Sequence, residues 1–488
     1  MKKGLVFSSA ILATMALASC SSNEVFDGGD GSQASSGQVI EIAVENAGSG
    51  LESRSGRPLY SSEAAQDIDN VKVVIVDASG NVAAEEMIEN WMTSDKVIAY
   101  DDASGHGRKI RIELTGDDKI ADGEYTVYAI GYSNDETTQS IYKVTSGGQV
   151  YSLNNYLQNK EVKNAKSGMK DLVLSNANTD KTKAEEIFAG STTLKVVNKK
   201  FSQGVTLHRQ VAGIFTYVKN IPYIFNKDGV VGTKLQLVAA QTNMNMVLGN
   251  YYGMTLSNNG NQDASKEQNK LMNVVNGTAP RGGSEQVVYT INLNDWFTEL
   301  KDVNNDGILD RYEYKQDESG KLVEDKGDGK QIWKNPLRGE DQDQLAAATF
   351  VKGSAFGGEF IIPFQQVSGT VTFQLRMVNA AENQVLRTWS ISLPDDDLIK
   401  SSILQWWSGS AWTYQENITE SKSNYSVLRN HLYGVGTKDS ADPDTDGKNP
   451  DPETPTPDVD DPQDLTTKQD IMLQVNDNWE VIHKMEVE

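Results

Sequence analysis

Apolar and polar residues alternate along much of this chain, with the period of two that is typical of half-buried β-strands. The first clear example is Gln38–Val44, where Ile40, Ile42 and Val44 alternate with polar or small residues. Similar alternations or short apolar runs recur at 71–76, 110–114, 124–132, 234–239, 286–293, 370–378 and 385–393. Because turn-rich connections separate these segments, the pattern predicts antiparallel sheets rather than β-α-β units.

Helical periodicity is sparse, and it is confined to 87–91, part of 152–166, and 294–300. The stretch 174–186 is polar and loop-like, and a new set of strands begins in 205–222. We therefore expect a domain boundary near residue 195. The Asn-, Gly- and Gln-rich region 240–285 is expected to form long surface loops. The sequence predicts an all-β protein, with one antiparallel β-sandwich in 55–195 and a second in 196–441.

The first 20 residues have the pattern of an export signal. A basic start precedes a mostly apolar segment, 4–18, which is too short for a membrane span. The segment ends in Leu-Ala-Ser-Cys20, the pattern of a bacterial lipobox, in which the Cys becomes the lipidated N-terminus. Because Cys20 is the only Cys of 488 residues, we favour this interpretation over an ordinary signal peptide. Residues 21–38, rich in Ser, Gly and Asp, predict a flexible leader.

Composition and charge exclude several classes of function. The net charge of −23, from 68 acidic and 45 basic residues, would repel the phosphate backbone of a nucleic acid. A single Cys excludes an internal disulfide and a thiolate zinc site, and the four His show no i, i+4 pair. No nucleophile elbow, phosphate-binding loop or dinucleotide fingerprint is present. Carboxylates are so abundant that no glycosidase-like pair of catalytic acids can be inferred from them. Because these catalytic motifs are missing, we predict that the protein is not an enzyme.

The end of the chain combines a stiff spacer with an amphipathic segment. Residues 442–464 are rich in Asp and contain half of the chain's 12 prolines, which predicts an extended spacer. In the following segment, 465–488, the apolar residues share odd positions: Ile471, Leu473, Val475, Trp479, Val481, Met485 and Val487. Such a strand needs a host sheet. The spacer favours insertion into another molecule, and the alternative is that the segment folds back as the last strand of its own domain.

The first strand is followed at once by a flexible loop that contains Arg54, Ser55 and Arg57. A trypsin-like, Arg-specific protease that cut between Arg54 and Ser55 would free the leader, 21–54, together with the strand Gln38–Val44. The sheet would then have a groove with unpaired edges and empty apolar pockets. The C-terminal strand of a neighbouring molecule could fill that groove.

Several segments carry a resemblance to a known family. They are the lipobox with Cys20, the Arg54 loop, 205–212, 358–363, 425–433, the Pro- and Asp-rich spacer, and 470–488 with Trp479. In order and spacing they resemble the fimbrillins, which are shaft subunits of type V pili, and especially the short-fimbria shaft proteins. The resemblance spans nearly the whole chain. An acidic insertion near 301–332 departs from the family pattern.

This resemblance implies two transthyretin-like β-sandwiches and a C-terminal donor strand. It implies an outer-membrane lipoprotein precursor that loses its first strand by proteolysis and then joins a surface fimbrium by donor-strand exchange. The partners would be other copies of the chain, accessory pilins and the membrane lipid, and the filament would support adhesion. The alternative from the sequence is a lipid-anchored surface glycan-binding protein, or a pilus tip or anchor adhesin that does not polymerise.

The acidic insertion contains a segment that matches the calcium loop of EF-hands, D-x-[DN]-x-[DN]-G-x5-E. The predicted ligands are Asp302, Asn304, Asp306, Ile308 through its carbonyl, Asp310 through water, and Glu313. Leu309 is expected to anchor the loop to the core. We predict a structural Ca²⁺ site, and the alternative is a solvated Asp/Asn/Gly turn. A second match, which starts at Asp442, is interrupted by prolines and belongs to the spacer.

An aromatic cluster completes the candidate sites. Its members are Trp406, Trp407, Trp412 and Tyr414. Such a cluster can stack on sugar rings, but packing at the edge of the second sandwich is the favoured interpretation.

Overall fold

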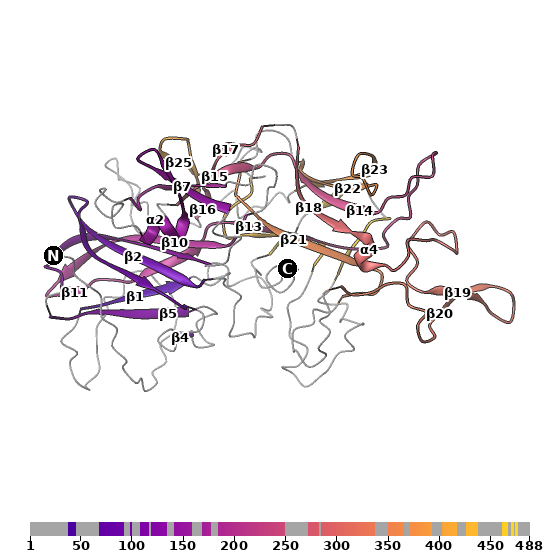
Figure 1. Cartoon of the computed structure of the whole chain (residues 1–488), viewed down its shortest axis with the longest axis horizontal. Coiled ribbons are helices and arrows are strands. Elements are labelled where there is room, and N and C mark those ends of the chain that lie inside the picture. The colour runs from indigo at the N-terminus through magenta and orange to yellow at the C-terminus, as the bar shows by residue number, and fades with distance from the viewer. Residues whose placement is uncertain are drawn as a thin grey trace.

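The computed structural model has an all-β architecture (Figure 1). It describes residues 38–44, 68–91, 98–99, 108–116, 119–133, 141–158, 168–176, 184–248, 272–282, 285–336, 350–365, 371–392, 403–416, 426–437, 461–466, 470–472 and 474–476. Within these residues, no helix is long and apolar enough to cross a membrane.

A nine-stranded sheet forms one end of the molecule (Figure 1). Its strand order is β3-β2-β6-β10-β12-β1-β5-β4, and β11 pairs with β10. The strands are β1 (Gln38–Val44), β2 (Asn70–Asp77), β3 (Val82–Ile88), β4 (Ile98–Ala99), β5 (Arg108–Leu114), β6 (Gly123–Tyr132), β10 (Ile187–Val197), β11 (Lys200–Phe201) and β12 (Val205–Arg209). The first strand in the sequence is thus an inner strand of this sheet.

This sheet folds over its own apolar core. One hydrophobic cluster combines Ile40 and Ile42 of β1 with Val73 of β2, Ile112 of β5 and Leu207 of β12. The alternation that predicted β1 and β5 explains this packing, because residues of one parity point to the core and those of the other parity face solvent.

Two further sheets form a sandwich in the second half of the chain, and their orders are β21-β13-β26-β29 and β18-β14-β22-β23-β28. The strands are β13 (Ala212–Lys219), β14 (Lys234–Ala239), β18 (Gln286–Asn292), β21 (Ala355–Ile361), β22 (Val371–Val378), β23 (Val385–Ser392), β26 (Leu432–Val435), β27 (Gln463–Asp464, which pairs with β13), β28 (Asp470–Met472) and β29 (Gln474–Asn476). In β22, Phe373, Leu375 and Met377 are buried, as their shared face predicted.

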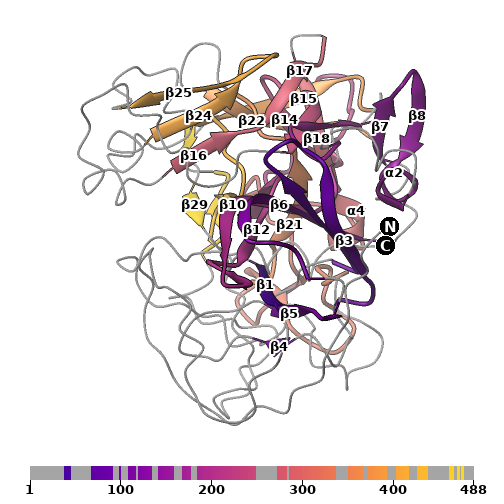
Figure 2. The same ribbon diagram turned by 90° about the vertical axis from the view of Figure 1, so that its left-hand side faces the viewer.

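Two smaller sheets flank the point where the halves meet. One has the order β17-β15-β9-β7-β8 and the other β16-β24-β25, and Figure 2 shows them on opposite sides. Their strands are β7 (Tyr142–Ser146), β8 (Gln149–Ser152), β9 (Leu172–Asn176), β15 (Asn243–Leu248), β16 (Met272–Val275), β17 (Gly277–Pro280), β24 (Ile403–Trp407) and β25 (Trp412–Glu416). Part of 240–285 is therefore strand rather than loop.

The predicted start of the second domain, 205–222, is divided between the two halves. β12 belongs to the first sheet, where it pairs with β10 and β1, and only β13 enters the second sandwich. Similarly, β9, which precedes the expected boundary, pairs with β15, which follows it. The reason is that strand pairing joins segments far apart in sequence, which a change in composition near residue 195 does not reveal.

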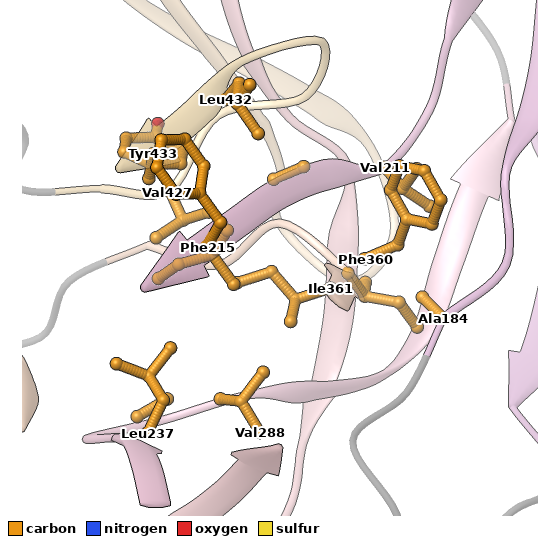
Figure 3. Packing of buried hydrophobic residues seen from close by; sticks show 14 of the residues in the cluster. Ala184, Val211, Phe215, Leu237, Val288, Phe360, Ile361, Val427, Leu432 and Tyr433 are labelled. Atoms are coloured by element: carbon orange, nitrogen blue, oxygen red, sulfur yellow. The ribbon is translucent and has the colours of Figure 1, made fainter. Parts of the chain in front are cut away.

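One continuous core runs from the outer face of the first sheet into the second sandwich. Figure 3 shows Phe215 of β13 and Ile361 of β21 over Leu237 of β14 and Val288 of β18. Ala184, which precedes β10, pairs with Phe360 and joins the same cluster. The two halves therefore share buried side chains.

Three short elements complete the fold. Helices α2 (Leu153–Gln158) and α4 (Leu293–Trp296) lie in or beside two of the predicted helical segments. The third prediction, 87–91, is wrong, because Met87 and Ile88 continue β3 and pair with β2. The hairpin β19 (Glu313–Gln316) and β20 (Leu322–Asp325) projects from the end of the molecule opposite the first sheet (Figure 1).

Candidate functional site

The first candidate site is the position of β1, which has a neighbour on each side. β1 pairs antiparallel with β5, from Gln38↔Leu114 to Ala43↔Lys109. On its other edge it pairs parallel with β12, from Ile42↔Val205 to Val44↔Leu207. Because β1 joins β5 to the rest of the sheet, its removal would leave a groove with two unpaired backbone edges.

Three of the described side chains of β1, those of Gln38, Ile40 and Ile42, fill buried positions. Ile40 and Ile42 have exposed fractions of 1% and 0%, and burial of each aliphatic side chain contributes about 1.5–3 kcal/mol. Gln38 is also fully buried. Its Nε2 donates to the carbonyl of Ile120, and its Oε1 accepts from the Ile120 N–H, both at 2.7 Å. A strand that replaced β1 would have to fill two apolar pockets and satisfy this buried backbone pair.

The opposite face of β1 carries Val39 and Glu41 and is partly exposed to solvent. Glu41 pairs with Arg111 of β5, with 3.5 Å between Oε2 and Nε, and the Arg111 side chain is 46% exposed. Behind the strand, a Cβ added to Gly204 would lie 2.6 Å from the Glu41 carbonyl oxygen. Gly204 thus permits β12 to approach the backbone of β1 closely.

The second candidate site is the tail, which begins at a fixed point on the second sandwich. β27 pairs parallel with β13, and Lys219 Nζ lies 3.1 Å from Asp461 Oδ1. Leu465 is fully buried, and its carbonyl accepts from Trp389 Nε1 at 3.2 Å. The end of the predicted spacer is therefore packed on its own domain.

Beyond this point the tail pairs with two different sheets of its own chain. β28 pairs parallel with β23, from Ser390↔Asp470 to Ser392↔Met472. β29 pairs antiparallel with β26, from Leu432↔Asn476 to Gly434↔Gln474. Ile471 is 3% exposed and belongs to the large core.

These pairings match the alternative in which the tail folds back on its own domain. The edges of β23 and β26 lie close to the point where the tail begins, and pairing with them satisfies its backbone groups when no second molecule is present. Each pairing covers three residues on one side only. Several predicted donor-strand residues lie outside the described residues: Leu473, Trp479, Val481, Met485 and Val487.

The predicted calcium loop forms a compact turn. Asp302 accepts from the N–H groups of Asp306 and Gly307 through its two oxygens, at 3.1 and 2.8 Å. Asn304 Nδ2 donates to Asp306 Oδ2 at 2.8 Å. Gly307 has a φ of +85°, which a residue with a Cβ adopts only with strain. In this conformation the side-chain oxygens of Asp302 and Asp306 accept hydrogen bonds from within the turn. This matches the alternative interpretation of the sequence, a solvated Asp/Asn/Gly turn.

The last two predicted ligands differ in their surroundings. Asp310 is buried, and its Oδ2 accepts from the Val303 N–H at 2.8 Å. Burial raises the pKa of Asp310, and the nearby carboxylates of Asp302 and Asp306 raise it further. Glu313 lies at the start of β19, with its Oε1 3.8 Å from Lys301 Nζ.

The loop is anchored to the second sandwich as expected, because Leu309 is buried in the large core. Its N–H donates to the Ile221 carbonyl at 2.9 Å, and Ile308 pairs with Pro222. In the part of the chain that the structure describes, no three His, Cys, Asp or Glu side chains are arranged to hold a metal ion. The calcium site therefore stays a prediction.

The aromatic cluster is divided between packing and surface. Trp406 packs against a small core of Val275, Leu404 and Leu428. Trp407 and Trp412 form a T-shaped pair on β24 and β25, with ring centroids 5.4 Å apart. Trp412 Nε1 donates to Asp171 Oδ1 at 2.9 Å. The backbone of Tyr414 lies in β25, and its side chain is outside the described residues, as are Cys20, Arg54 and Ser55.

Sequence reasoning missed a buried ion pair in the first sheet, between β12 and the residue directly before β10. Arg209 of β12 pairs with Glu186, and both side chains are almost fully buried. The Arg209 guanidinium lies 4.9 Å from the centroid of the Phe188 ring, and its Nη1 lies 3.5 Å from Asn430 Oδ1. The available signal was a charged residue inside an apolar strand pattern, since such residues are seldom buried without a partner.

Comparison with known proteins gives only distant similarity. No protein-family model matches the chain, and no curated protein matches it. Among solved structures, a candidate adhesin from Bacteroides thetaiotaomicron is 8% identical to this chain, with a TM-score of 0.34. The match covers 81% of this chain and 100% of the adhesin chain. The fimbrial anchor protein Mfa2 from Porphyromonas gingivalis is 9% identical, with a TM-score of 0.30 and coverages of 80% and 99%.

A fimbrial assembly protein from Parabacteroides distasonis is 11% identical to this chain. Its TM-score is 0.26, and the match covers 72% of this chain and 98% of the other. At these identities and TM-scores, the similarity alone assigns the chain neither a family nor a function.

Proposed function

We propose that this protein is a structural subunit of a surface fimbrium. It is exported as a lipoprotein through Cys20, loses its first strand to an Arg-specific protease, and polymerises with copies of itself and accessory pilins by donor-strand exchange. The filament supports adhesion, and Ca²⁺ stiffens the loop at 302–313. The observation that carries this proposal is the inner position of β1, because its loss would open a groove bordered by β5 and β12.

The strand that is proposed to leave and the strand that is proposed to enter differ in how they are held. β1 is bound by neighbours on both sides, whereas β28 and β29 of the tail each pair along one edge for three residues. Backbone pairs on both edges satisfy donors and acceptors that a single edge leaves to solvent. A tail that exchanged its own edges for the groove of another molecule would therefore gain backbone hydrogen bonds.

The alternative function is a glycan-binding or adhesive lipoprotein that does not polymerise. The observation that favours it is the T-shaped pair of Trp407 and Trp412, because partly exposed indoles offer faces on which sugars stack. The docking of the tail on its own sheets is also compatible with a monomer. The two functions differ in what they require of the tail.

Electron microscopy of purified surface filaments, labelled with antibody against this chain, tests the proposal. We expect label along filaments from cells with the full chain. Deletion of residues 470–488 should leave a folded, secreted monomer that forms no filaments, because Leu465 and the pairs of β27 remain. Unlabelled filaments, or normal filaments from the truncated chain, would contradict the proposal and favour the glycan-binding alternative.

A further inference from the structure

We infer that the tail of one copy enters the β1 groove of the next in a single register, with Gln469 at the position of Gln38. This inference rests on the proposed strand exchange and names the pairing that the exchange produces. In this register Ile471 takes the place of Ile40, and the following odd positions continue the match. The two segments are QVIEIAV at 38–44 and QDIMLQV at 469–475.

The groove imposes a specific order of side chains. Its first position takes an amide that both donates to and accepts from the backbone of Ile120, as Gln38 does at 2.7 Å in each direction. The next two inward positions take the aliphatic side chains of Ile40 and Ile42, which are at most 1% exposed. An entering strand therefore needs Gln, then two aliphatic residues, at a spacing of two.

The tail meets this order in one register. Gln469 is followed by Ile471, Leu473 and Val475 at steps of two, opposite the former places of Gln38, Ile40, Ile42 and Val44. Leu for Ile conserves side-chain volume, which apolar sites tolerate best. A shift by two residues would place Ile471 against Ile120, and an apolar side chain would leave that buried N–H and carbonyl unpaired.

A shift by one residue is excluded by the pattern of the tail. It would turn Gln474 and Asn476 toward the core, because side chains on a strand alternate between faces. In the inferred register, the direction also follows. The entering strand runs antiparallel to β5 and parallel to β12, as β1 does.

The register predicts which residues of two copies lie opposite each other. Position 472 takes the place of Glu41, opposite Arg111, and position 470 takes the place of Val39, opposite Glu113. Arg111 and Glu113 share the outward face of β5, so cysteines there leave the core unchanged. Directly opposed residues are close enough for a disulfide, whereas diagonal neighbours about 7–8 Å apart are not.

The test uses four double variants of the full chain, assembled into filaments and mildly oxidised. Two pairs fit the register: Arg111→Cys with Met472→Cys, and Glu113→Cys with Asp470→Cys. Two recombine the same positions diagonally: Arg111→Cys with Asp470→Cys, and Glu113→Cys with Met472→Cys. Each single variant serves as a control for Cys20.

We expect ladders of disulfide-linked subunits on non-reducing gels from the two register pairs, at least about ten times stronger than from the diagonal pairs. Ladders of equal or greater strength from a diagonal pair would overturn the inferred register while leaving strand exchange intact. Filaments that form normally but give no ladder from any pair would instead contradict strand exchange itself. The two failures are therefore distinguishable.

Discussion

Gln38 and Ile120 lie 82 residues apart in the sequence and exchange two hydrogen bonds of 2.7 Å across a buried contact. The amide of Gln38 satisfies both backbone groups of Ile120, which is itself only 3% exposed. This contact fixes the first residue of β1 to the loop before β6. It also makes the start of the groove polar, whereas the positions that follow are apolar.

Replacement of Gln38 by Leu should destabilise the full chain. The variant keeps side-chain volume but leaves the buried Ile120 N–H and carbonyl unpaired, which is expected to lower the free energy of unfolding by about 2 kcal/mol or more. Denaturant unfolding measures this change. Val39→Thr is the matched control, because Val39 is 38% exposed on the opposite face of β1, and it should shift stability by less than about 0.5 kcal/mol. Equal effects of the two variants would contradict a special role for the Gln38 contact.

The alternation of apolar residues was sufficient to predict β1, β14, β18, β22 and β23. It succeeded because a strand with one buried face has a local pattern. The pairing of β12 with β1 and of β9 with β15 has no such local signal, since each depends on contacts between distant segments. The Gln38 contact was missed for the same reason.

The candidate sites show a similar division. The turn at Asp302 and the burial of Leu309 follow from the sequence, because the spacing of Asp, Asn and Gly residues defines the turn. The tail is less determined. Its alternation predicts a strand but does not specify the edge that the strand joins. The pattern at 471–475 is compatible with its own sheets and with the groove of another copy.

A charge on the apolar face of the tail should block assembly. Val475→Asp would place a carboxylate on the apolar face that the odd positions of the tail share, and burial of an unpaired charge is strongly unfavourable. Gln474→Asp is the matched control, because successive positions of an extended strand alternate between its two faces. We expect no filaments from the first variant and normal filaments from the second, while circular dichroism shows that both monomers fold. Filaments from both variants would contradict the predicted inward face.

Truncation should distinguish the anchored part of the tail from the part proposed to exchange. A chain that ends at residue 466 keeps Leu465, which is fully buried, and a chain that ends at residue 460 loses it. Loss of a buried Leu typically destabilises a protein by about 2–5 kcal/mol. We expect the shorter chain to be less stable than the longer one by at least about 2 kcal/mol in denaturant unfolding. Equal stabilities would show that 461–466 contributes nothing to the second sandwich.

Calcium binding should depend on the ends of the predicted loop. Asp302→Ala combined with Glu313→Ala removes the first and last proposed ligands, and we expect calorimetry to show loss of Ca²⁺ uptake. Asp317→Ala, in the turn of the β19–β20 hairpin, is the control that removes a carboxylate outside the motif. A single loop of this kind is expected to bind with a Kd of about 10⁻⁴–10⁻³ M. If the unmodified chain takes up no Ca²⁺ at millimolar concentration, the calcium site is excluded and the loop is a turn held by its own hydrogen bonds.

Cleavage between Arg54 and Ser55 should control assembly. In the proposed mechanism the tail enters the position that β1 occupies between β5 and β12, so an uncut subunit would have no place for a donor strand. Arg54→Ala should therefore accumulate as a lipidated, membrane-bound monomer. Arg57→Ala is the matched control, because Pro58 follows Arg57 and makes that bond a poor protease site. It should assemble normally, and N-terminal sequencing of its filaments should begin at Ser55. Filaments that retain residues 21–54 would show that β1 need not leave, and they would exclude the proposed mechanism.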